Sequence, residues 1–303
     1  MSRDKRFLSI LILFCFLSLA NPAYCIEPLR VTFLDVWQGD SILIQTPQQK
    51  VILIDGGQSS NEEYNSFFDA GKDVVIPYLL EKGIKHIDVL VLSHAHRDHV
   101  GGLIKVLEEF PVGRVLDPGY VHTTDVYKRF LNLVKDKNIA YSNPKSGDRL
   151  LWDKELEVIV LNPSEEFYSG DDACNENSLV IKMEYNKISF LFTGDIGIAA
   201  KRALINKFPK RLKTDVLKIS HQGADSSFLG AFVKKVLPSI GIISVGKGNH
   251  FGHPGSKILE FSERKDIKIF RTDEDGFIEI GTDGKSLEID LKGKMKFQEC
   301  RES

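Results

Sequence analysis

The residues best suited to chemistry form one hexapeptide, which runs from His94 to His99 with the sequence His-Ala-His-Arg-Asp-His. His94 and His96 are two positions apart, so in an extended segment their side chains point to the same side. Asp98 and His99 follow at the point where a helix is expected to begin. Imidazole and carboxylate ligands at this density are typical of a site for zinc, manganese or iron. We therefore predict a metal centre here, in preference to ordinary surface or core histidines.

Two later residues are candidates for the same centre. Asp195 ends the apolar run 190–194, where an unpaired carboxylate would be costly to bury. His221 follows the apolar segment 216–220 in the same way. Each signal is weak alone, since a lone histidine is more often structural. Together with the hexapeptide, the two residues complete a ligand set for two metal ions.

The hexapeptide is expected to lie between a buried strand, Ile87–Leu92, and a helix, Val100–Glu109. Chemistry at the carboxyl end of a strand is common in proteins that combine helices with sheets. Further strands are predicted at 30–36, 41–46, 51–54, 155–161, 178–185, 188–192, 216–219, 240–245, 267–270 and 277–280, and further helices at 74–82, 124–137, 198–207, 228–236 and 256–263.

Two strand-rich halves, each with its own helices, indicate two packed sheets with helices on the outside. The predicted fold class is α/β (α+β), a four-layer αββα sandwich. We expect residues 26–303 to form one domain, with a hairpin turn at Asn186 and Lys187.

The first 25 residues have the pattern of a signal peptide. Arg3, Lys5 and Arg6 precede the apolar run 7–19, and small residues suited to cleavage follow at 20–25. We expect a secreted or periplasmic protein, with an uncleaved N-terminal anchor as the alternative. No apolar run of about 20 residues follows this segment, so we expect no transmembrane channel.

Cysteine content and charge leave several questions open. Cys174 and Cys300 form either one disulfide or two free thiols in an oxidising compartment. The net charge of −2 does not indicate a nucleic-acid-binding protein. One basic stretch without acidic residues favours a nucleic-acid partner, although basic runs are usually solvated surface. The stretch contains Lys201, Arg202, Lys207, Lys210, Arg211 and Lys213.

These motifs together resemble the metallo-β-lactamase superfamily. More narrowly, the chain resembles the nuclease-like domain of the ComEC competence proteins, as a separate secreted form. The resemblance rests on segments in the expected order along almost the whole chain after residue 25, namely 33–41, 53–57, 94–102, 175–180, 193–195, 217–223, 244–249 and 252–254.

The resemblance implies two divalent metal ions, Zn²⁺ or Mn²⁺. His94 and His96 would bind metal 1, and Asp195 would bridge the two ions. Metal 2 would take Asp98, His99 and His221. The superfamily usually supplies one more histidine to metal 1, but no histidine lies between His122 and His221. The loop with Asn175 and Ser178 takes its place.

Other roles follow from the same resemblance. Asp98 would also orient the attacking hydroxide. Lys247, Asn249 and His253 would lie beside the metals, where they could bind an anionic substrate or protonate a leaving group; ordinary loop polarity is the alternative for Lys247 and Asn249. Asp40 and Asp55 would orient the histidine ligands, or are simple turn residues. The chain departs from its relatives at Trp37, where they usually carry glycine, and at Gln222, where they often carry a second histidine.

We therefore expect a metal-dependent hydrolase, a phosphodiesterase or nuclease that acts on DNA or another nucleic acid through a hydroxide activated by two metal ions. A hydrolase of esters, lactones or β-lactams is the alternative, and a non-catalytic binding protein is a third hypothesis. The sequence does not fix the substrate or the oligomeric state, since fold alone does not determine function.

Overall fold

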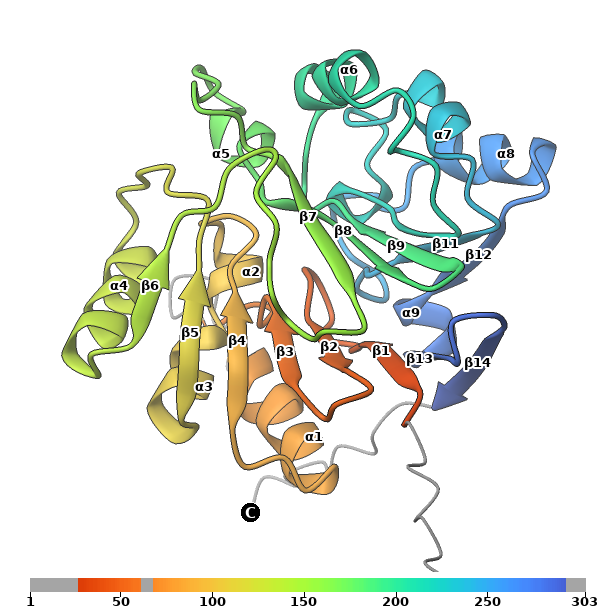
Figure 1. Cartoon of the computed structure of the whole chain (residues 1–303). Helices are drawn as coiled ribbons and strands as arrows, with labels where there is room; N and C mark the ends of the chain where they lie inside the picture. The colour runs from red at the N-terminus through yellow and green to blue at the C-terminus, as the bar shows by residue number, and fades with distance from the viewer. Residues whose placement is uncertain (1–26, 61–67, 293–303) are drawn as a thin grey trace, which may run out of the picture.

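The structure is a computed structural model that describes residues 27–60 and 68–292. The predicted signal peptide and Cys300 lie outside these residues. Two β-sheets pack face to face, with helices on both outer faces (Figure 1). The predicted αββα sandwich is thereby confirmed.

The first sheet has eight strands in the order β14-β13-β1-β2-β3-β4-β5-β6. Strands β3, β4, β5 and β6 pair in parallel, and the pairs among β14, β13, β1, β2 and β3 are antiparallel. The bounds are β1 Leu29–Phe33, β2 Ile42–Gln45, β3 Val51–Ile54, β4 Ile87–Val91, β5 Val112–Leu116, β6 Ala140–Ser142, β13 Phe277–Thr282 and β14 Leu287–Lys292.

The second sheet has six strands in the order β12-β11-β10-β9-β8-β7. The hairpin between β8 and β9 turns at Asn186 and Lys187, as predicted. The bounds are β7 Glu157–Asn162, β8 Val180–Tyr185, β9 Ile188–Phe192, β10 Val216–Lys218, β11 Ile240–Ile243 and β12 Lys268–Arg271.

Helices cover the outer faces of both sheets (Figure 1). On the first sheet these are a π-helical turn, Gly71–Val75, that runs into α1 Ile76–Glu81, together with α2 Arg97–Val100, α3 Leu103–Glu109 and α4 Asp125–Asp136. On the second sheet they are α6 Ile198–Lys207, α7 Gly230–Val236 and α8 Ser256–Arg264. Shorter helical segments are α5 Ala173–Glu176, the 3₁₀ turn His221–Gly223 and α9 Thr272–Asp275.

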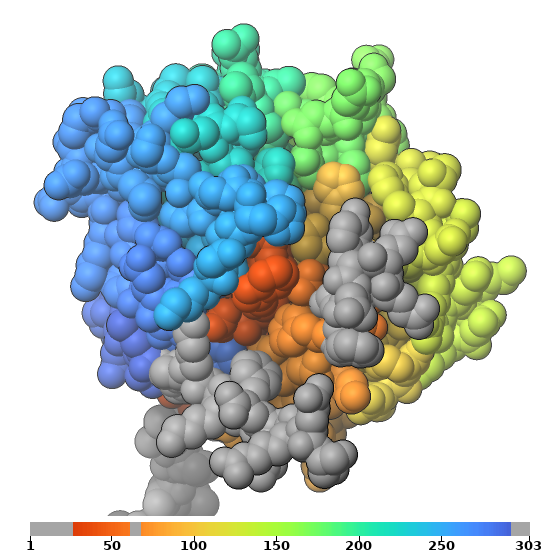
Figure 2. Space-filling view, turned by 180° about the vertical axis from the view of Figure 1, so that it is seen from behind, coloured from red at the N-terminus to blue at the C-terminus, as the bar shows by residue number. Residues whose placement is uncertain are grey.

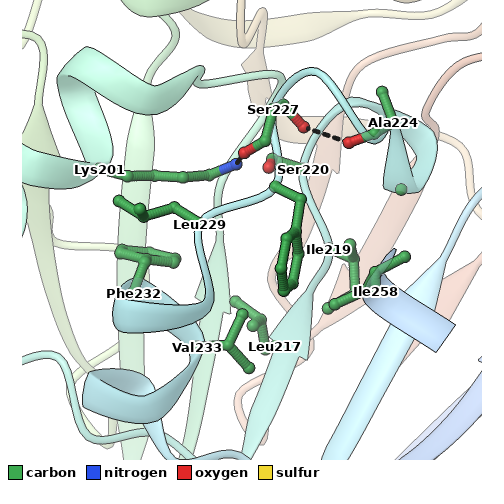
Figure 3. A pocket seen from close by; sticks show the side chains of 12 residues that line it. Lys201, Leu217, Ile219, Ser220, Ala224, Ser227, Leu229, Phe232, Val233 and Ile258 are labelled. Carbon is green, nitrogen blue, oxygen red and sulfur yellow. Dashed lines mark hydrogen bonds between the residues drawn. The ribbon is translucent and has the colours of Figure 1, made fainter. Parts of the chain in front are cut away.

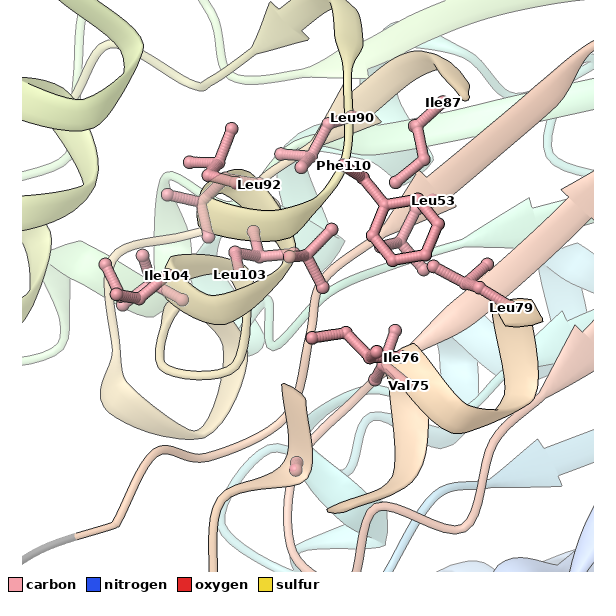
Figure 4. Packing of buried hydrophobic residues seen from close by; sticks show 14 of the residues in the cluster. Leu53, Val75, Ile76, Leu79, Ile87, Leu90, Leu92, Leu103, Ile104 and Phe110 are labelled. Atoms are coloured by element: carbon pink, nitrogen blue, oxygen red, sulfur yellow. The ribbon is translucent and has the colours of Figure 1, made fainter. Parts of the chain in front are cut away.

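Three apolar clusters hold the four layers together, and alternation along the strands sorts side chains between them. In β3, Val51 and Leu53 face the helices of the first sheet, whereas Ile52 and Ile54 face the second sheet. Figure 4 shows Leu53 on the helix side, among Leu79, Leu103 and Phe110. The third cluster packs β9, β10 and β11 against α6, α7 and α8.

The predicted helix Val100–Glu109 is wrong in one respect, because the chain breaks it into α2 and α3 at Gly101 and Gly102. A Cβ added at Gly102 would lie 2.0 Å from the carbonyl oxygen of Gly56. The glycine therefore allows the segment after the hexapeptide to pack directly against the backbone that follows β3.

Strands β5, β6 and β14 were not predicted. Gly113 and the charged Arg114 interrupt the apolar pattern of β5, and β14 is an edge strand in which Glu288 and Asp290 alternate with apolar residues. None of the helices among the described residues is long and apolar enough to cross a bilayer.

Candidate metal centre

The hexapeptide follows β4, which is buried in the middle of the first sheet between β3 and β5. His94 and His99 are almost completely buried, while His96 and Asp98 are partly exposed. The chain stays extended through His96 and becomes helical at Arg97. The extended segment thus presents His94 and His96, and the first helical turn presents Asp98 and His99.

The predicted ligands from the rest of the chain meet the hexapeptide. Asp195, just after β9, places Oδ2 at 3.2 Å from Nε2 of His99 and 3.9 Å from Nε2 of His94. His94 Nε2 and His96 Nδ1 are 3.1 Å apart. Asp98 Oδ2 lies 3.6 Å from His99 Nε2. The ligand atoms of His94, His99 and Asp195 thus lie within 4.8 Å of one another, with His96 beside His94 and Asp98 beside His99.

His221 reaches these residues through a sharp turn of the backbone. Both His221 and Gln222 have positive φ, 54° and 46°. The N–H of His221 donates to Oδ1 of Asp195 at 3.1 Å, and the Gln222 amide donates to Oδ2 of the same residue at 3.1 Å. Left-handed backbone at non-glycine residues is unfavourable and is often found at functional sites. The turn brings His221 into the wall of the same cleft as His96, Asp98 and Asp195.

This cleft has a volume of about 700 Å³. In the view from behind, a hollow lies between the light-blue segment near residue 250 and the orange part of the chain, with red N-terminal residues inside it (Figure 2). Trp37, Phe251 and His253 also line the cleft.

Asp55 fixes the orientation of the hexapeptide. Its carboxylate accepts hydrogen bonds from the N–H and the hydroxyl of Ser93, at 2.7 and 2.6 Å, and lies 2.9 Å from Nδ1 of His99. With Nδ1 held by Asp55, Nε2 of His99 faces Asp195. A carboxylate behind a histidine ligand is the usual arrangement at metal sites.

Asp40 approaches from the loop after β1, with Oδ2 at 3.8 Å from Nδ1 of His99. A Cβ added at the preceding Gly39 would lie 1.9 Å from the carbonyl oxygen of Asp98, so this loop packs directly onto the hexapeptide. Burial raises the pKa of Asp40 to about 6, even though Lys218 beside it acts to lower that pKa.

Lys218 is a residue of this site for which the sequence analysis proposed no role. It is 1% exposed, forms an ion pair with Oδ2 of Asp40, and places Nζ 3.7 Å from Oδ1 of Asp195. The signal in the sequence was a lysine inside the apolar run 216–219. Such a charge is expensive to bury without a partner.

The electrostatics of the site suit a cation. Burial lowers the pKa of His94 well below its ordinary value, so that imidazole is neutral and free to bind. Burial alone would raise the pKa of Asp195, but His99 and Lys218 hold it well below the ordinary range. Burial opposes a charge on His99, yet Asp195 and the neighbouring carboxylates hold its pKa well above the ordinary value. A divalent ion could replace that proton between His99 and Asp195, so the donor set fits the predicted metals.

Asn175 and Ser178, the residues expected in place of a third histidine, lie close to Asp195 and the cleft. Ser178 donates from Oγ to the carbonyl of Asn175 at 2.7 Å and accepts the N–H of Asp195 at 3.3 Å, so it positions the backbone of Asp195. Asn175 donates to Asp172 at 2.8 Å. Its Oδ1 is buried and accepts no hydrogen bond from the described residues, and the side chain lines the cleft.

Hydrogen bonds of Asn249 hold the Gly-rich loop after β11 in shape. Asn249 donates to the carbonyls of Gly246 and His253 at 2.9 and 2.7 Å and accepts the N–H of His253 at 3.0 Å. Its amide therefore stabilises the loop. Lys247 is exposed, and its carbonyl oxygen accepts a hydrogen bond from the indole N–H of Trp37. His253 lies in the cleft wall, with its ring centroid 5.8 Å from that of His221.

The basic stretch is not a continuous surface, because Lys201 points inward. Lys201 is 4% exposed, and its Nζ donates to the carbonyl of Ser227 beside a small apolar cavity (Figure 3). Burial lowers the pKa of Lys201 to about 7. The exposed members are Arg202, Lys207, Lys210, Arg211 and Lys213.

Comparison with known proteins supports the same assignment. Residues 34–247 match the family described as the metallo-beta-lactamase superfamily. The chain is 34% identical over 258 residues to ComE operon protein 3 of Bacillus subtilis, covering 82% of this chain and 32% of that protein. It is 27% identical over 273 residues to competence protein ComA of Neisseria gonorrhoeae, and 29% identical over 280 residues to recombination protein 2 of Haemophilus influenzae. These matches cover 90% and 92% of this chain but 35% and 32% of the relatives, so the chain spans about a third of their length.

Two solved structures have a similar fold. One is a variant of the β-hydroxylase CmlA, with a TM-score of 0.53 and 13% identity over 84% of this chain and 54% of that one. The other is Igni18, a metallo hydrolase from the archaeon Ignicoccus hospitalis, with a TM-score of 0.50 and 14% identity over 82% of this chain and 98% of that one. At these identities the similarity concerns the fold alone.

Proposed function

The chain belongs to the metallo-beta-lactamase superfamily, with ComEC-like relatives, and from this premise we propose that it cleaves phosphodiester bonds of DNA or another nucleic acid. We further propose that it uses two divalent ions, zinc or manganese. The observation that carries the proposal is the convergence of the hexapeptide with Asp195 and His221 in one cleft.

Two divalent ions in such a site would lower the pKa of water and offset negative charge on a phosphoryl oxygen. His94 and His96 would hold one ion, and Asp98, His99 and His221 the other, with Asp195 between them. The buried carboxylate of Asp55 keeps Ser93 and His99 in place before substrate arrives.

Asp98 and His253 are the candidates for proton transfer. Asp98 is partly exposed at the cleft, so its carboxylate is free to orient the attacking water. The ring of His253 lies across the cleft wall beside His221, and its Nδ1 is buried without a hydrogen-bond partner among the described residues. His253 is therefore the candidate for giving a proton to a leaving oxygen, a role for which the side chain must come within hydrogen-bond distance of that oxygen.

The rim of the cleft favours a nucleic acid over a small ester. Trp37 and Phe251 line the cleft and are 38% and 55% exposed, although large apolar side chains are usually buried. Exposed aromatic rings beside cations are typical of surfaces that stack unpaired bases. Arg97 supplies an exposed cation in the same lining. Two of the relatives are named for competence and for recombination, which also favours a nucleic acid.

The test is a substrate panel for the purified, metal-loaded protein. Plasmid DNA, single-stranded DNA, a chromogenic phosphodiester and a chromogenic β-lactam would be incubated in parallel. We expect cleavage of DNA and of the small diester, and none of the lactam. Hydrolysis of the lactam without cleavage of any phosphodiester would overturn the substrate assignment and support the alternative hydrolase. Binding of DNA without any turnover would support a non-catalytic role.

A charge-reversal pair tests whether the exposed part of the basic stretch binds the substrate. Lys210→Glu with Arg211→Glu should weaken cleavage of DNA and reduce its salt dependence, yet spare the small diester, since phosphate contacts mainly supply long-range affinity. Lys135→Glu with Lys285→Glu is the matched control, because both lysines are exposed and belong to α4 and to the turn after β13. Equal effects of the two pairs would remove the basic stretch from the proposal.

We also propose that the protein acts outside the cytoplasm, because residues 1–25 have the signal-peptide pattern. Those residues lie outside the described part of the chain. Fractionation of cells, combined with N-terminal sequencing of the recovered protein, tests this. A chain that keeps residue 1 in the membrane fraction would support the anchor instead.

A further inference from the structure

A second group of metal-binding side chains lies beside the predicted centre and shares His96 with it. His96, His122 and Cys174 each place a ligand atom within 4.8 Å of the other two. The rings of His96 and His122 meet at 83° with their centroids 5.7 Å apart. Neither His122 nor Cys174 belongs to the motifs discussed above.

The topology explains why these residues meet. β4 and β5 are parallel neighbours, so the loops after both strands emerge at the same edge of the first sheet. The loop after β4 carries His96, and the loop after β5 carries His122. Cys174 enters from α5, in the segment where the usual third histidine of metal 1 is missing.

We infer that His122 and Cys174 supply the ligands of metal 1 that the motif lacks, and that they make this position selective for zinc. The inference rests on the proposed metal-dependent function and names further ligands of that same site. His94 and His96, already assigned to metal 1, are in contact with each other at 3.1 Å.

Each side chain is available for this role. His122 has Nδ1 at 3.0 Å from the hydroxyl of Thr124, which leaves Nε2 as the nitrogen available to bind a metal. Cys174 is 7% exposed and has no disulfide partner among the described residues. The adjacent Asn175 also presents a buried oxygen without a hydrogen-bond partner, so α5 brings two donors to one place.

The side chains of His96, His122 and Cys174 would need to move only a little to bind zinc. Ligand atoms of a tetrahedral zinc site lie about 3.3–3.8 Å apart, given bond lengths of about 2.0–2.3 Å. Atoms within 4.8 Å of one another can close to those separations by shifts of about 1 Å. His122 is half-buried in a loop, so its ring is the member best able to move.

The donor chemistry distinguishes between the predicted metals. A thiolate with imidazoles is a zinc ligand set, whereas manganese prefers carboxylates and water. With Cys174 bound, metal 1 should be zinc even where manganese is in excess. Metal 2, with Asp98 and the bridging Asp195, has no such preference built in.

The test uses the full chain under reducing conditions, loaded with Co²⁺ as a spectroscopic probe or with Zn²⁺. We expect a thiolate-to-cobalt charge-transfer band in the near ultraviolet, which Cys174→Ser abolishes and Cys300→Ser leaves unchanged. Cys174→Ser and His122→Gln should each weaken binding of one of two zinc ions at least tenfold. His250→Gln is the matched control for His122, since His250 lies on the exposed rim of the same cleft.

The results separate this inference from the proposed function. A protein that binds two zinc ions without the band, or keeps the band in Cys174→Ser, overturns the inference even if it cleaves DNA. A disulfide between Cys174 and Cys300 in the protein from its native compartment would also overturn it. The band in a protein that cleaves no phosphodiester would support the metal ligands and reject the substrate.

Discussion

Replacement of Lys218 by methionine should affect stability and metal binding in opposite directions. Methionine keeps most of the volume of the aliphatic stem and removes the buried charge. Asp40 and Asp195 then lose the cation that lies between them. Both carboxylates are 2% exposed or less, so water cannot take its place.

The expected magnitude follows from the separation of the charges. At 3.7 Å, the ammonium and Oδ1 of Asp195 attract each other by about 4–5 kcal/mol at an effective dielectric constant of about 20. The cost of burying Lys218 offsets part of this attraction. Removing one partner of a buried ion pair generally lowers stability by about 3–5 kcal/mol, and we expect that loss for Lys218→Met without metal. Affinity for divalent ions should rise, because a fixed positive charge has left the site.

The assay is urea unfolding of the wild type and the variant, in chelator and in saturating zinc. Asp40→Asn and the double variant complete a double-mutant cycle, which measures the coupling of the pair directly. Lys182→Met is the control, since Lys182 is also a buried lysine but donates to the carbonyls of Arg211 and Lys213, away from the site. Its loss of stability should be the same in chelator and in zinc.

Three results would refute this reasoning about the pair. A loss below about 1 kcal/mol for Lys218→Met would mean that the carboxylates do not need the cation. Additive effects in the cycle, within about 0.5 kcal/mol, would mean that Lys218 and Asp40 are not coupled. Weaker zinc binding by the variant would mean that Lys218 organises the ligands and does not compete with the metal.

Three other predictions can be checked with the same preparations. Asp98→Ala should lower the rate of phosphodiester cleavage by about 10²–10⁴-fold. The unfolding midpoint should change little, since Asp98 lies in the cleft and outside the apolar clusters. An unchanged rate would contradict the proposed role of Asp98. Trp37→Ala and Phe251→Ala should each weaken binding of single-stranded DNA by about 1–3 kcal/mol, measured by titration, and leave KM for the small diester unchanged. For Lys201, burial lowers the pKa to about 7, below its value of 10.5 in the unfolded chain, so the unfolded state binds more protons between these values and stability rises with pH. The wild type and Lys201→Met should therefore differ in their free energy of unfolding, and this difference should rise by about 2–3 kcal/mol from pH 7 to pH 9. A difference that does not change with pH would contradict a buried, neutral amine.

The sequence predicts this fold well wherever a single pattern decides the structure. The bounds of β3, β9 and α6 are those expected, Val51–Ile54, Ile188–Phe192 and Ile198–Lys207, because polar turn residues, glycine or proline stand close to their ends. The pattern fails for β5, where Gly113 and Arg114 stand in the middle of the strand. Pairing with β4 stabilises that strand, and a pairing partner is not visible in the local sequence.

The missed strand has a consequence for the site. Without β5, nothing in the sequence places the loop of His122 beside that of His96. The hexapeptide was evident because its ligands are local, and Asp195 and His221 were evident because each ends an apolar strand. His122 and Cys174 carry neither signal, since their position depends on the order of strands in the first sheet. Lys218 differs again, because its position in an apolar run was visible but its two partners were not.

Lys218 and Cys174 would affect different parts of the proposed metal centre. Lys218 places a permanent positive charge beside Asp195, so a cation there must overcome its repulsion. Cys174, once deprotonated, adds a negative charge beside His96. The motif alone suggests that metal 1 is the weaker site, since it lacks a histidine. The proposed thiolate reverses that order, because it strengthens metal 1, whereas Lys218 opposes both ions at the carboxylate that they would share. A protein with this arrangement should therefore retain the ion at His94 and His96 and exchange the ion at Asp98, His99 and His221 more readily.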